Sequence, residues 1–177
     1  MRFEDMGSRI AIIGPSSSGK STLAVELARA LDVKVVHLDR LHHLPDTQWQ
    51  PRPKDEFAAL HDAAIREDGW VMEGNYFTHM PARFNRATAV IWLDPAPVSS
   101  LWRWAWRTLQ PGHERVGMLE GAADRLNWNM VRYILWQYPK GRERYARLLE
   151  TLSVPVLRLN SMAALNRQRV RWGLVRR

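Results

Sequence analysis

The most informative part of this chain is residues 14–21, Gly14-Pro15-Ser16-Ser17-Ser18-Gly19-Lys20-Ser21. They match every fixed position of the pattern G-x-x-x-x-G-K-[ST], which happens by chance about once or less in a hundred chains of this length. The glycines let the backbone turn tightly and direct several N–H groups at one anion. Lys20 adds a positive charge for the β- and γ-phosphates, and the Ser21 hydroxyl is a Mg²⁺ ligand. The stretch therefore predicts a binding loop for Mg·ATP, with these contact residues: Gly14, Pro15, Ser16, Ser17, Ser18, Gly19, Lys20, Ser21 and Thr22.

The sequence around this loop has the pattern of a strand before it and a helix after it. Residues 9–13 form a short apolar run, and residues 21–31 carry apolar side chains at helical spacing. Further strands are predicted at residues 33–38, 70–72, 87–93 and 154–159. Further helices are predicted at 54–68, 97–109, 122–137, 141–152 and 161–172, with a break at Pro139 and a cap at Ser161. This alternation indicates an α/β fold with a five-stranded parallel sheet flanked by helices.

Length and composition favour one globular domain, residues 1–177. The chain has no cysteine, which excludes disulfides, thiolate metal sites and cysteine nucleophiles. No apolar run reaches the roughly 18–20 residues that cross a membrane, and the first residues do not resemble a signal peptide. We therefore expect a cytoplasmic protein without a membrane partner.

The net charge of +8 is concentrated in the second half of the chain. Residues 101–177 hold 15 basic and 5 acidic side chains, whereas residues 1–100 hold 11 basic and 13 acidic ones. Such a surface can meet the phosphates of a nucleotide or a nucleic acid, or it can be an ordinary solvated surface.

Three acidic residues stand where predicted strands end, namely Asp39, Glu73 and Asp94. In open α/β sheets, ligands bind beyond the carboxyl ends of the strands. Asp39 is our candidate for the base that accepts a proton from a hydroxyl-bearing substrate. Glu73 and Asp94 are candidates for holding Mg²⁺ through water. The metal candidates together are Ser21, Asp39, Glu73 and Asp94, although acids at strand ends are also often caps or turn formers.

The chain resembles the adenylate-kinase-like branch of P-loop kinases, and most of all the FlaR-type DNA topology modulation proteins. Besides the loop, the resemblance rests on residues 37–41 with Pro45 and Trp49, and on residues 70–76, 91–94, 101–103 with Arg107, and 138–140. The family usually has Asp where this chain has Glu73, which keeps the charge on a longer side chain.

The resemblance implies a core domain, an acceptor-binding insert at about residues 40–68 and a lid at about residues 108–128. In such kinases, arginines on and beside the lid neutralise the transferring phosphoryl group. Arg103, Arg107, Arg115 and Arg125 stand in this region. The catalytic residues that follow are Lys20, Asp39, Arg103, Arg107 and Arg115. The family also places its base-binding loop after the last strand, which implies Arg158 and Asn160 beside the adenine.

Two functions are compatible with these features. The first is a kinase that transfers the γ-phosphate of Mg·ATP to an unidentified small molecule, either nucleotide-like or hydroxyl-bearing. The alternative is an ATP-dependent protein that binds nucleic acid or modulates DNA topology, without kinase activity. Trp102, Trp104 and Trp106 lie among Arg103 and Arg107, and such interleaving of aromatic and basic residues can bind single-stranded nucleic acid by stacking. We expect core packing for these tryptophans, so nucleic acid is the less favoured partner.

Overall fold

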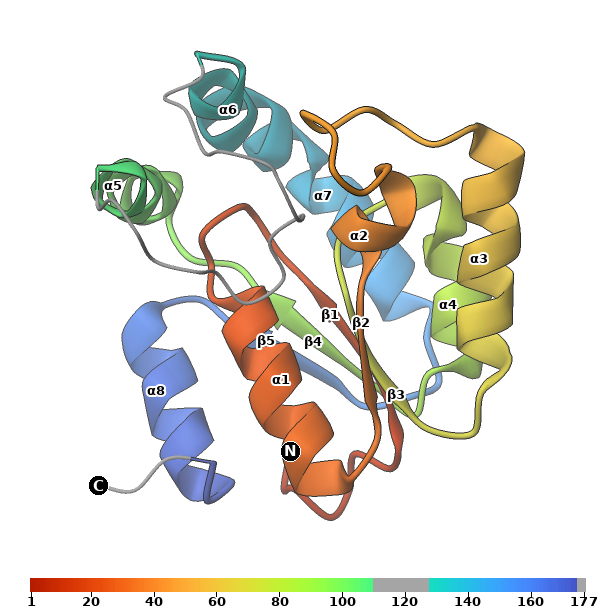
Figure 1. The fold of residues 1–177 in the computed structure, drawn as a ribbon. Coiled ribbons are helices and arrows are strands. Elements are labelled where there is room, and N and C mark those ends of the chain that lie inside the picture. Colours follow the sequence, from red (N-terminus) through yellow and green to blue (C-terminus); the bar gives the residue numbers. More distant parts are fainter. Residues whose placement is uncertain (110–127, 175–177) are drawn as a thin grey trace.

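The computed structural model describes residues 1–109 and 128–174. Its centre is a sheet of five parallel strands in the order β2-β3-β1-β4-β5 (Figure 1). The strands are β1 (Arg9–Ile13), β2 (Lys34–His37), β3 (Trp70–Glu73), β4 (Ala89–Leu93) and β5 (Val156–Leu159). The predicted fold class, an α/β fold with a five-stranded parallel sheet, is confirmed.

The three central strands β3, β1 and β4 are almost completely buried, whereas β2 and β5 at the edges are partly exposed. The register brings the carboxyl ends together, because Glu73 pairs with Ile12 on one side and with His37 on the other. On the other side of β1, Ile13 pairs with Trp92. Residues that follow β1, β2, β3 and β4 therefore meet along one edge of the sheet.

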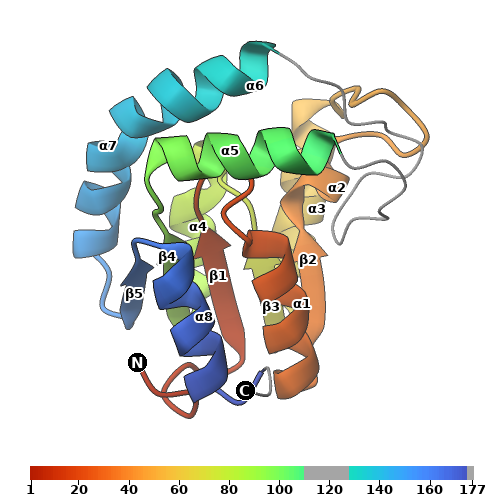
Figure 2. The same cartoon turned by 90° about the vertical axis from the view of Figure 1, so that its left-hand side faces the viewer.

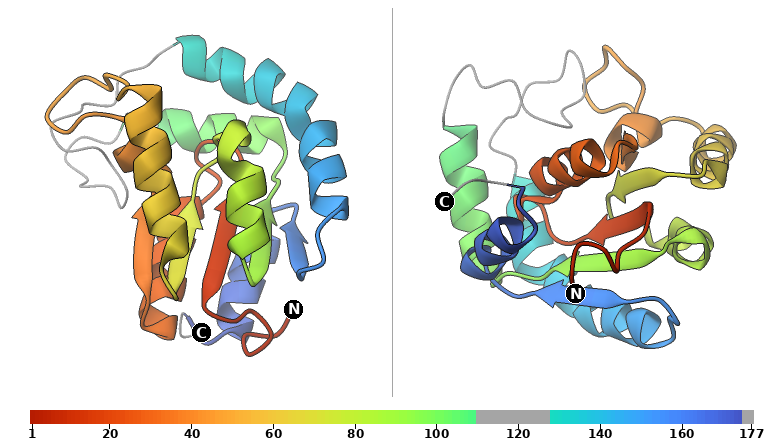
Figure 3. Two further views of the ribbon diagram at one scale, coloured as in Figure 1. Left: turned by 90° about the vertical axis from the view of Figure 1, so that its right-hand side faces the viewer. Right: turned by 90° about the horizontal axis from the view of Figure 1, so that it is seen from below.

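Helices cover both faces of the sheet (Figure 3). On one face lie α1 (Lys20–Leu31) and α8 (Met162–Arg171), which pack on side chains such as Ile10 and Ile12. On the other lie α3 (Lys54–Arg66), α4 (Met80–Arg86) and α7 (Tyr138–Glu150), which pack on Ala11 and Ile13. Alternate residues of β1 thus serve two separate cores, as expected for a strand with two buried faces.

The remaining elements gather beyond the carboxyl ends of the strands (Figures 1 and 2). They are α2 (Leu38–His42), α5 (Pro97–Thr108), α6 (Trp128–Arg132) and the π-helical turn η2 (Tyr133–Gln137). The short 3₁₀ turn η1 (Phe77–His79) leads from the end of β3 into α4. None of the described helices combines the length and the apolar character needed to span a lipid bilayer.

The predicted break at Pro139 is wrong. The chain stays helical from α6 through η2 into α7, and Pro139 lies in the first turn of α7. Proline has no N–H to donate inside a helix, so a regular helix would lose a hydrogen bond here. The π turn just before it accommodates the change, since the N–H of Tyr138 donates to the carbonyl of Tyr133, five residues earlier.

Two short helices, α2 and α4, were not predicted, because each has too few turns to show a helical period. The second strand was predicted to reach Leu38, but β2 ends at His37 and Leu38 is the first residue of α2. Residues 110–121, whose three glycines and one proline also predict a mobile excursion, lie outside the described residues. So does all of the predicted lid except residues 108, 109 and 128.

Candidate active site

The predicted phosphate loop connects β1 to α1, at the amino end of that helix. Gly14 and Gly19 both have positive φ angles, 151° and 93°, and so does Ser17 with 61°. A Cβ atom on Gly14 would collide with the carbonyl oxygen of Leu93, so only glycine fits there. The positive end of the α1 dipole faces the loop, as anion-binding loops require.

Two hydroxyls of this loop are buried and have no partner in the part of the chain that the structure describes. The Oγ atoms of Ser17 and Ser18 have no hydrogen-bond partner within residues 1–109 and 128–174. Buried polar atoms are normally satisfied, and exceptions are typical of places where a ligand or ion completes the bonding. The amine of Lys20 donates to the carbonyl of Pro15 at 2.8 Å and so lies along the loop. These features fit a loop that binds an oxyanion.

Glu73 forms the centre of a buried network at the end of β3. Ser21 Oγ donates to Glu73 Oε1 at 2.9 Å, and His37 Nδ1 lies 2.9 Å from the same oxygen. Burial favours the neutral carboxyl, but the hydrogen bond from His37 and the charge of Lys20 outweigh it and lower the pKa of Glu73. The carboxylate is therefore ionised, and the structure brings the predicted metal candidates Ser21 and Glu73 together.

The described residues contain no group of three or more histidine, aspartate or glutamate side chains placed to hold a metal ion. Mg²⁺ in phosphate-transfer sites usually keeps several waters and takes one or two protein ligands plus substrate oxygens. Ser21 and an ionised Glu73 fit that donor set. His37 was not predicted to take part, because its neighbour on β3 is known only from the strand order.

Asp39 lies in the first turn of α2, directly after β2, and its side chain is exposed. The hydroxyl of Tyr76 donates to Asp39 Oδ1 at 2.7 Å. Burial, with the charge of Asp39 next in size, raises the pKa of Tyr76, so the phenol stays protonated and remains a donor. Rings of His42, Phe57 and Tyr76 pack against one another beside Asp39, with centroids 4.8 to 5.1 Å apart.

Asp94 has a different environment. Its buried side chain accepts from Arg142 at 2.7 Å and from Arg158 at 2.5 Å, both at Oδ2, while Oδ1 has no partner in the described part of the chain. Arg158 also lies over the ring of Trp92, 4.2 Å from its centroid. These contacts join Asp94 to two arginines rather than to Ser21, and two neighbouring cations compete with a metal ion. Its role as a metal candidate stays a prediction.

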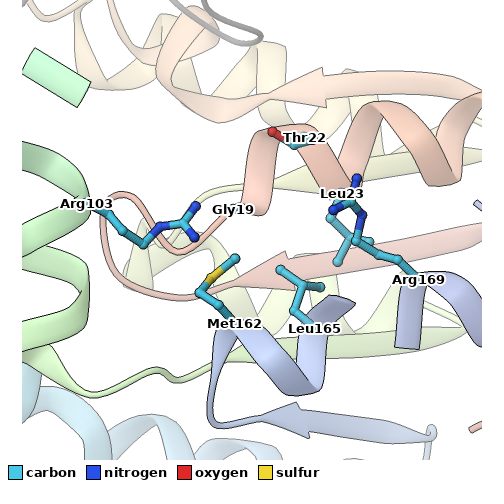
Figure 4. Close-up of a pocket in the computed structure, with 7 residues that line it drawn as sticks. All are labelled: Gly19, Thr22, Leu23, Arg103, Met162, Leu165 and Arg169. Carbon is cyan, nitrogen blue, oxygen red and sulfur yellow. The ribbon is translucent and has the colours of Figure 1, made fainter. Parts of the chain in front are cut away.

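A small pocket lies beside the phosphate loop (Figure 4). It is lined by Gly19, Thr22, Leu23, Arg103, Met162, Leu165 and Arg169. Arg103 reaches it from α5 and donates from Nε to the carbonyl of Ser17 at 3.0 Å, and burial lowers its pKa. Met162 and Leu165 of α8 supply an apolar wall of the pocket.

Only some of the residues predicted to bind the nucleotide line this pocket. Arg158 and Asn160 are not among its lining residues, whereas Gly19, Thr22 and Arg103 are. Arg107 belongs to α5, but its side chain lies outside the described part of the structure, as do Arg115 and Arg125 entirely. The roles of these three arginines stay predictions.

Comparison with known proteins identifies the fold. No model of a protein family matches the chain, and neither does any curated protein. Among solved structures, shikimate kinase from Bacteroides thetaiotaomicron is similar, with a TM-score of 0.53 and 18% identity over 92% of this chain and 96% of that one. Shikimate kinase from Acinetobacter baumannii, in complex with shikimate, has a TM-score of 0.52 and 17% identity over 94% and 92%. The chain has the fold of P-loop kinases.

Proposed function

We propose that this protein is a phosphotransferase that moves the γ-phosphoryl group of Mg·ATP to a small molecule, either hydroxyl-bearing or nucleotide-like. The observation that carries the proposal is the hydrogen bond between Ser21, at the end of the phosphate loop, and the buried, ionised Glu73. Asp39 stands at the end of β2, the strand next to β3, and is exposed to an acceptor. A triphosphate loop, a carboxylate for Mg²⁺ and a base thus follow neighbouring strands.

Each group has a defined task in this proposal. Residues 14–21 and Thr22 would hold the triphosphate, and Lys20 would neutralise its β- and γ-oxygens. Ser21 and, through water, Glu73 would hold Mg²⁺, which when bound withdraws charge from the phosphate oxygens. Arg103 would lie beside the adenine of the nucleotide, from its place in the pocket. Arg107 and Arg115 are proposed to neutralise the transferring group.

The transfer step then needs one base. Asp39 accepts the proton of the acceptor hydroxyl while the hydroxyl oxygen forms a bond to the γ-phosphorus. The bond from that phosphorus to the bridging oxygen breaks, and its electron pair leaves with ADP. The hydrogen bond from Tyr76 fixes the orientation of Asp39 during this step. For a nucleotide-like acceptor that attacks through a phosphate oxygen, the same carboxylate instead orients the acceptor.

The finer resemblance, to FlaR-type topology modulation proteins, belongs to the same proposal. It is supported by residues 37–41 and 70–76, since Tyr76 donates to Asp39 and Glu73 bonds to His37 at the ends of adjacent strands. The proposed acceptor insert, residues 40–68 of a single cytoplasmic domain, contains His42 and Phe57 of the ring cluster beside Asp39.

An ADP-release screen over nucleosides, nucleotides, sugars and antibiotics tests this function. We expect Lys20→Ala to abolish ATP binding in calorimetry. We expect Asp39→Asn to bind ATP normally but to lose about 10²- to 10⁴-fold in kcat, the usual contribution of a general base. Lys34→Ala and Asp68→Asn, exposed changes at the opposite end of the sheet, are the matched controls. Undiminished ATP binding by Lys20→Ala, or ADP release that needs no acceptor, would refute the proposal.

One observation favours the second function, ATP-dependent nucleic-acid binding. Trp102 and Trp106 are 68% and 58% exposed, and their rings stack on each other with centroids 6.2 Å apart. Helix α5, which carries them, contains no acidic residue. Exposed aromatic rings among arginines are typical of single-strand binding surfaces.

A further inference from the structure

The last residue of β3 and the turn after it, residues 73–76, contact three parts of the candidate site at once. Glu73 bonds to Ser21 of α1 and to His37 of β2. Tyr76 bonds to Asp39 of α2. Asn75 accepts, at its Oδ1, a hydrogen bond from the backbone N–H of Gly14, at 3.0 Å. Gly14 is the first residue of the phosphate loop, so Asn75 holds the point where the loop leaves β1.

The backbone around Asn75 is held in place by a residue of α4. Arg83 of α4 is completely buried, and its guanidinium donates to the carbonyls of Gly74 and Asn75 at 2.9 and 3.1 Å. Gly74 has a φ of 135°, and a Cβ atom there would lie 2.9 Å from the Cβ of Leu38. The backbone can therefore take this turn only with glycine, and Arg83 holds the turn where it forms.

The amide of Asn75 reaches further, to the helical arm formed by α6, η2 and α7. Its Nδ2 donates to the hydroxyl of Tyr133 at 2.9 Å. The two contacts define the amide orientation, because the Gly14 N–H needs an acceptor and so faces Oδ1. Burial raises the pKa of Tyr133 to about 12, so its hydroxyl stays neutral and can accept from Asn75.

The π turn explains why Tyr133 faces this way. Tyr133 begins η2 and Tyr138 follows it by five residues, which in a regular α-helix would point the two side chains in different directions. A π turn brings residues five apart nearly into line. Both tyrosines therefore face the strand ends, where the hydroxyl of Tyr138 accepts from Trp92 Nε1 at 2.8 Å. Tyr133 alone of the pair is linked to the phosphate loop.

We propose that Asn75 and Tyr133 are positioning residues for the phosphate loop: Tyr133 holds the Asn75 amide, and Asn75 holds the backbone N–H of Gly14. The inference rests on the proposed ATP-dependent function and adds the residues that keep its donor site in shape. A loop whose N–H groups must converge on one phosphate binds less tightly when its first residue can shift. The loss should therefore fall on ATP affinity rather than on the proton transfer at Asp39.

Calorimetry with ATP, without any acceptor, tests the inference on the full chain. We expect Tyr133→Phe to weaken ATP binding by about threefold to tenfold, the effect of one neutral hydrogen bond. Asn75→Ala should weaken it at least as much. Tyr138→Phe is the matched control, because it removes a hydroxyl from the same arm without touching the loop contact. It should leave the Kd for ATP unchanged.

A double variant separates positioning from a general loss of structure. If Tyr133 acts through Asn75, then Tyr133→Phe adds nothing to the Kd in the Asn75→Ala background. Independent, additive losses would refute the chain of contacts. Should Asn75→Ala fail to fold, Tyr133→Phe compared with Tyr138→Phe still decides the question. Equal ATP affinity of these two variants would overturn the inference, whereas a wild-type protein that binds no ATP would overturn both the inference and the proposed function.

Discussion

Glu73 is a buried residue that keeps its charge because partners on two other elements, α1 and β2, favour the ionised carboxylate. The hydrogen bonds from Ser21 and His37 and the charge of Lys20 outweigh the cost of burial. A buried carboxylate without such partners would take up a proton. The arrangement therefore provides a permanent negative charge next to the phosphate loop, where Mg²⁺ would need it.

His61 shows the opposite case, a buried side chain whose neighbours disfavour its charge. It is completely buried near Phe57 and His79, and its Nε2 has no partner among the described residues. Burial and, to a smaller extent, the charge of Arg83 lower its pKa, despite the nearby Asp62. The unfolded chain then binds a proton at a higher pH than the folded one. The native state should lose stability as the pH falls below about 6.5, by up to about 1.4 kcal/mol per pH unit.

We predict that His61→Phe removes this part of the acid sensitivity. Urea unfolding of the wild type and of the variant between pH 7.5 and pH 5 measures the difference, with the pH values chosen around the ordinary histidine pKa of about 6.5. The free energies of unfolding should diverge on acidification, with the wild type losing more. Parallel curves would show that His61 titrates in the same way in the folded and unfolded states.

At the scale of elements, Asp94 joins two strands and a helix. It ends β4, and its carboxylate accepts from Arg158 of β5 and Arg142 of α7. The side chain of Asp94 is fully buried, whereas those of Arg142 and Arg158 are 38% and 49% exposed. Neutralising the carboxylate weakens three charge-assisted hydrogen bonds, one from Arg142 and two from Arg158, but leaves both guanidinium groups access to water.

We predict that Asp94→Asn lowers the free energy of unfolding by about 1.5–3 kcal/mol, as for loss of hydrogen bonds to charged groups. The Mg²⁺ concentration needed for half-maximal ADP release should not change. Glu143→Gln is the control, since its ion pair with Arg147 is highly exposed and should contribute less than about 1 kcal/mol. A stable Asp94→Asn protein with a raised Mg²⁺ requirement would instead support the metal role predicted from the sequence.

The strands show how much of the fold and of the candidate site could be predicted from the sequence. The bounds of β1 were predicted correctly, because a strand buried on both faces is a continuous apolar run. The edge strands β2 and β5 were each predicted two residues too long, since one side of each is exposed and the apolar pattern fades gradually. That Asp39 and Glu73 follow strands could be predicted in the same way. The hydrogen bonds between His37 and Glu73 and from the Gly14 N–H to Asn75 could not be predicted, because they depend on the strand order.

At the scale of the whole molecule, the surface of α5 differs from our expectation. Core packing is correct for Trp104, which is 5% exposed, and wrong for Trp102 and Trp106. Residues four apart share one face of a helix, and this face points to solvent, with Val98 at its start also exposed. The basic half of the chain thus presents stacked aromatic rings as well as positive charge.

This surface gives the last prediction, on which the choice between the two functions depends. If the protein is a small-molecule kinase, single-stranded DNA should bind only weakly, with a Kd above about 10⁻⁶ M at physiological salt, because charge alone gives non-specific affinity of this order. Binding should weaken further with salt, and the double variant Trp102→Ala/Trp106→Ala should bind equally weakly. If the rings stack on bases, the double variant should lose about 1–3 kcal/mol of binding free energy for each base released.

Fluorescence anisotropy with a labelled oligonucleotide distinguishes the two results. Trp136→Ala, a change on the neighbouring helical arm, is the control. A loss confined to the Trp102/Trp106 variant would favour nucleic-acid binding, whereas equal and salt-sensitive curves for all three proteins would leave the kinase as the function that the structure supports.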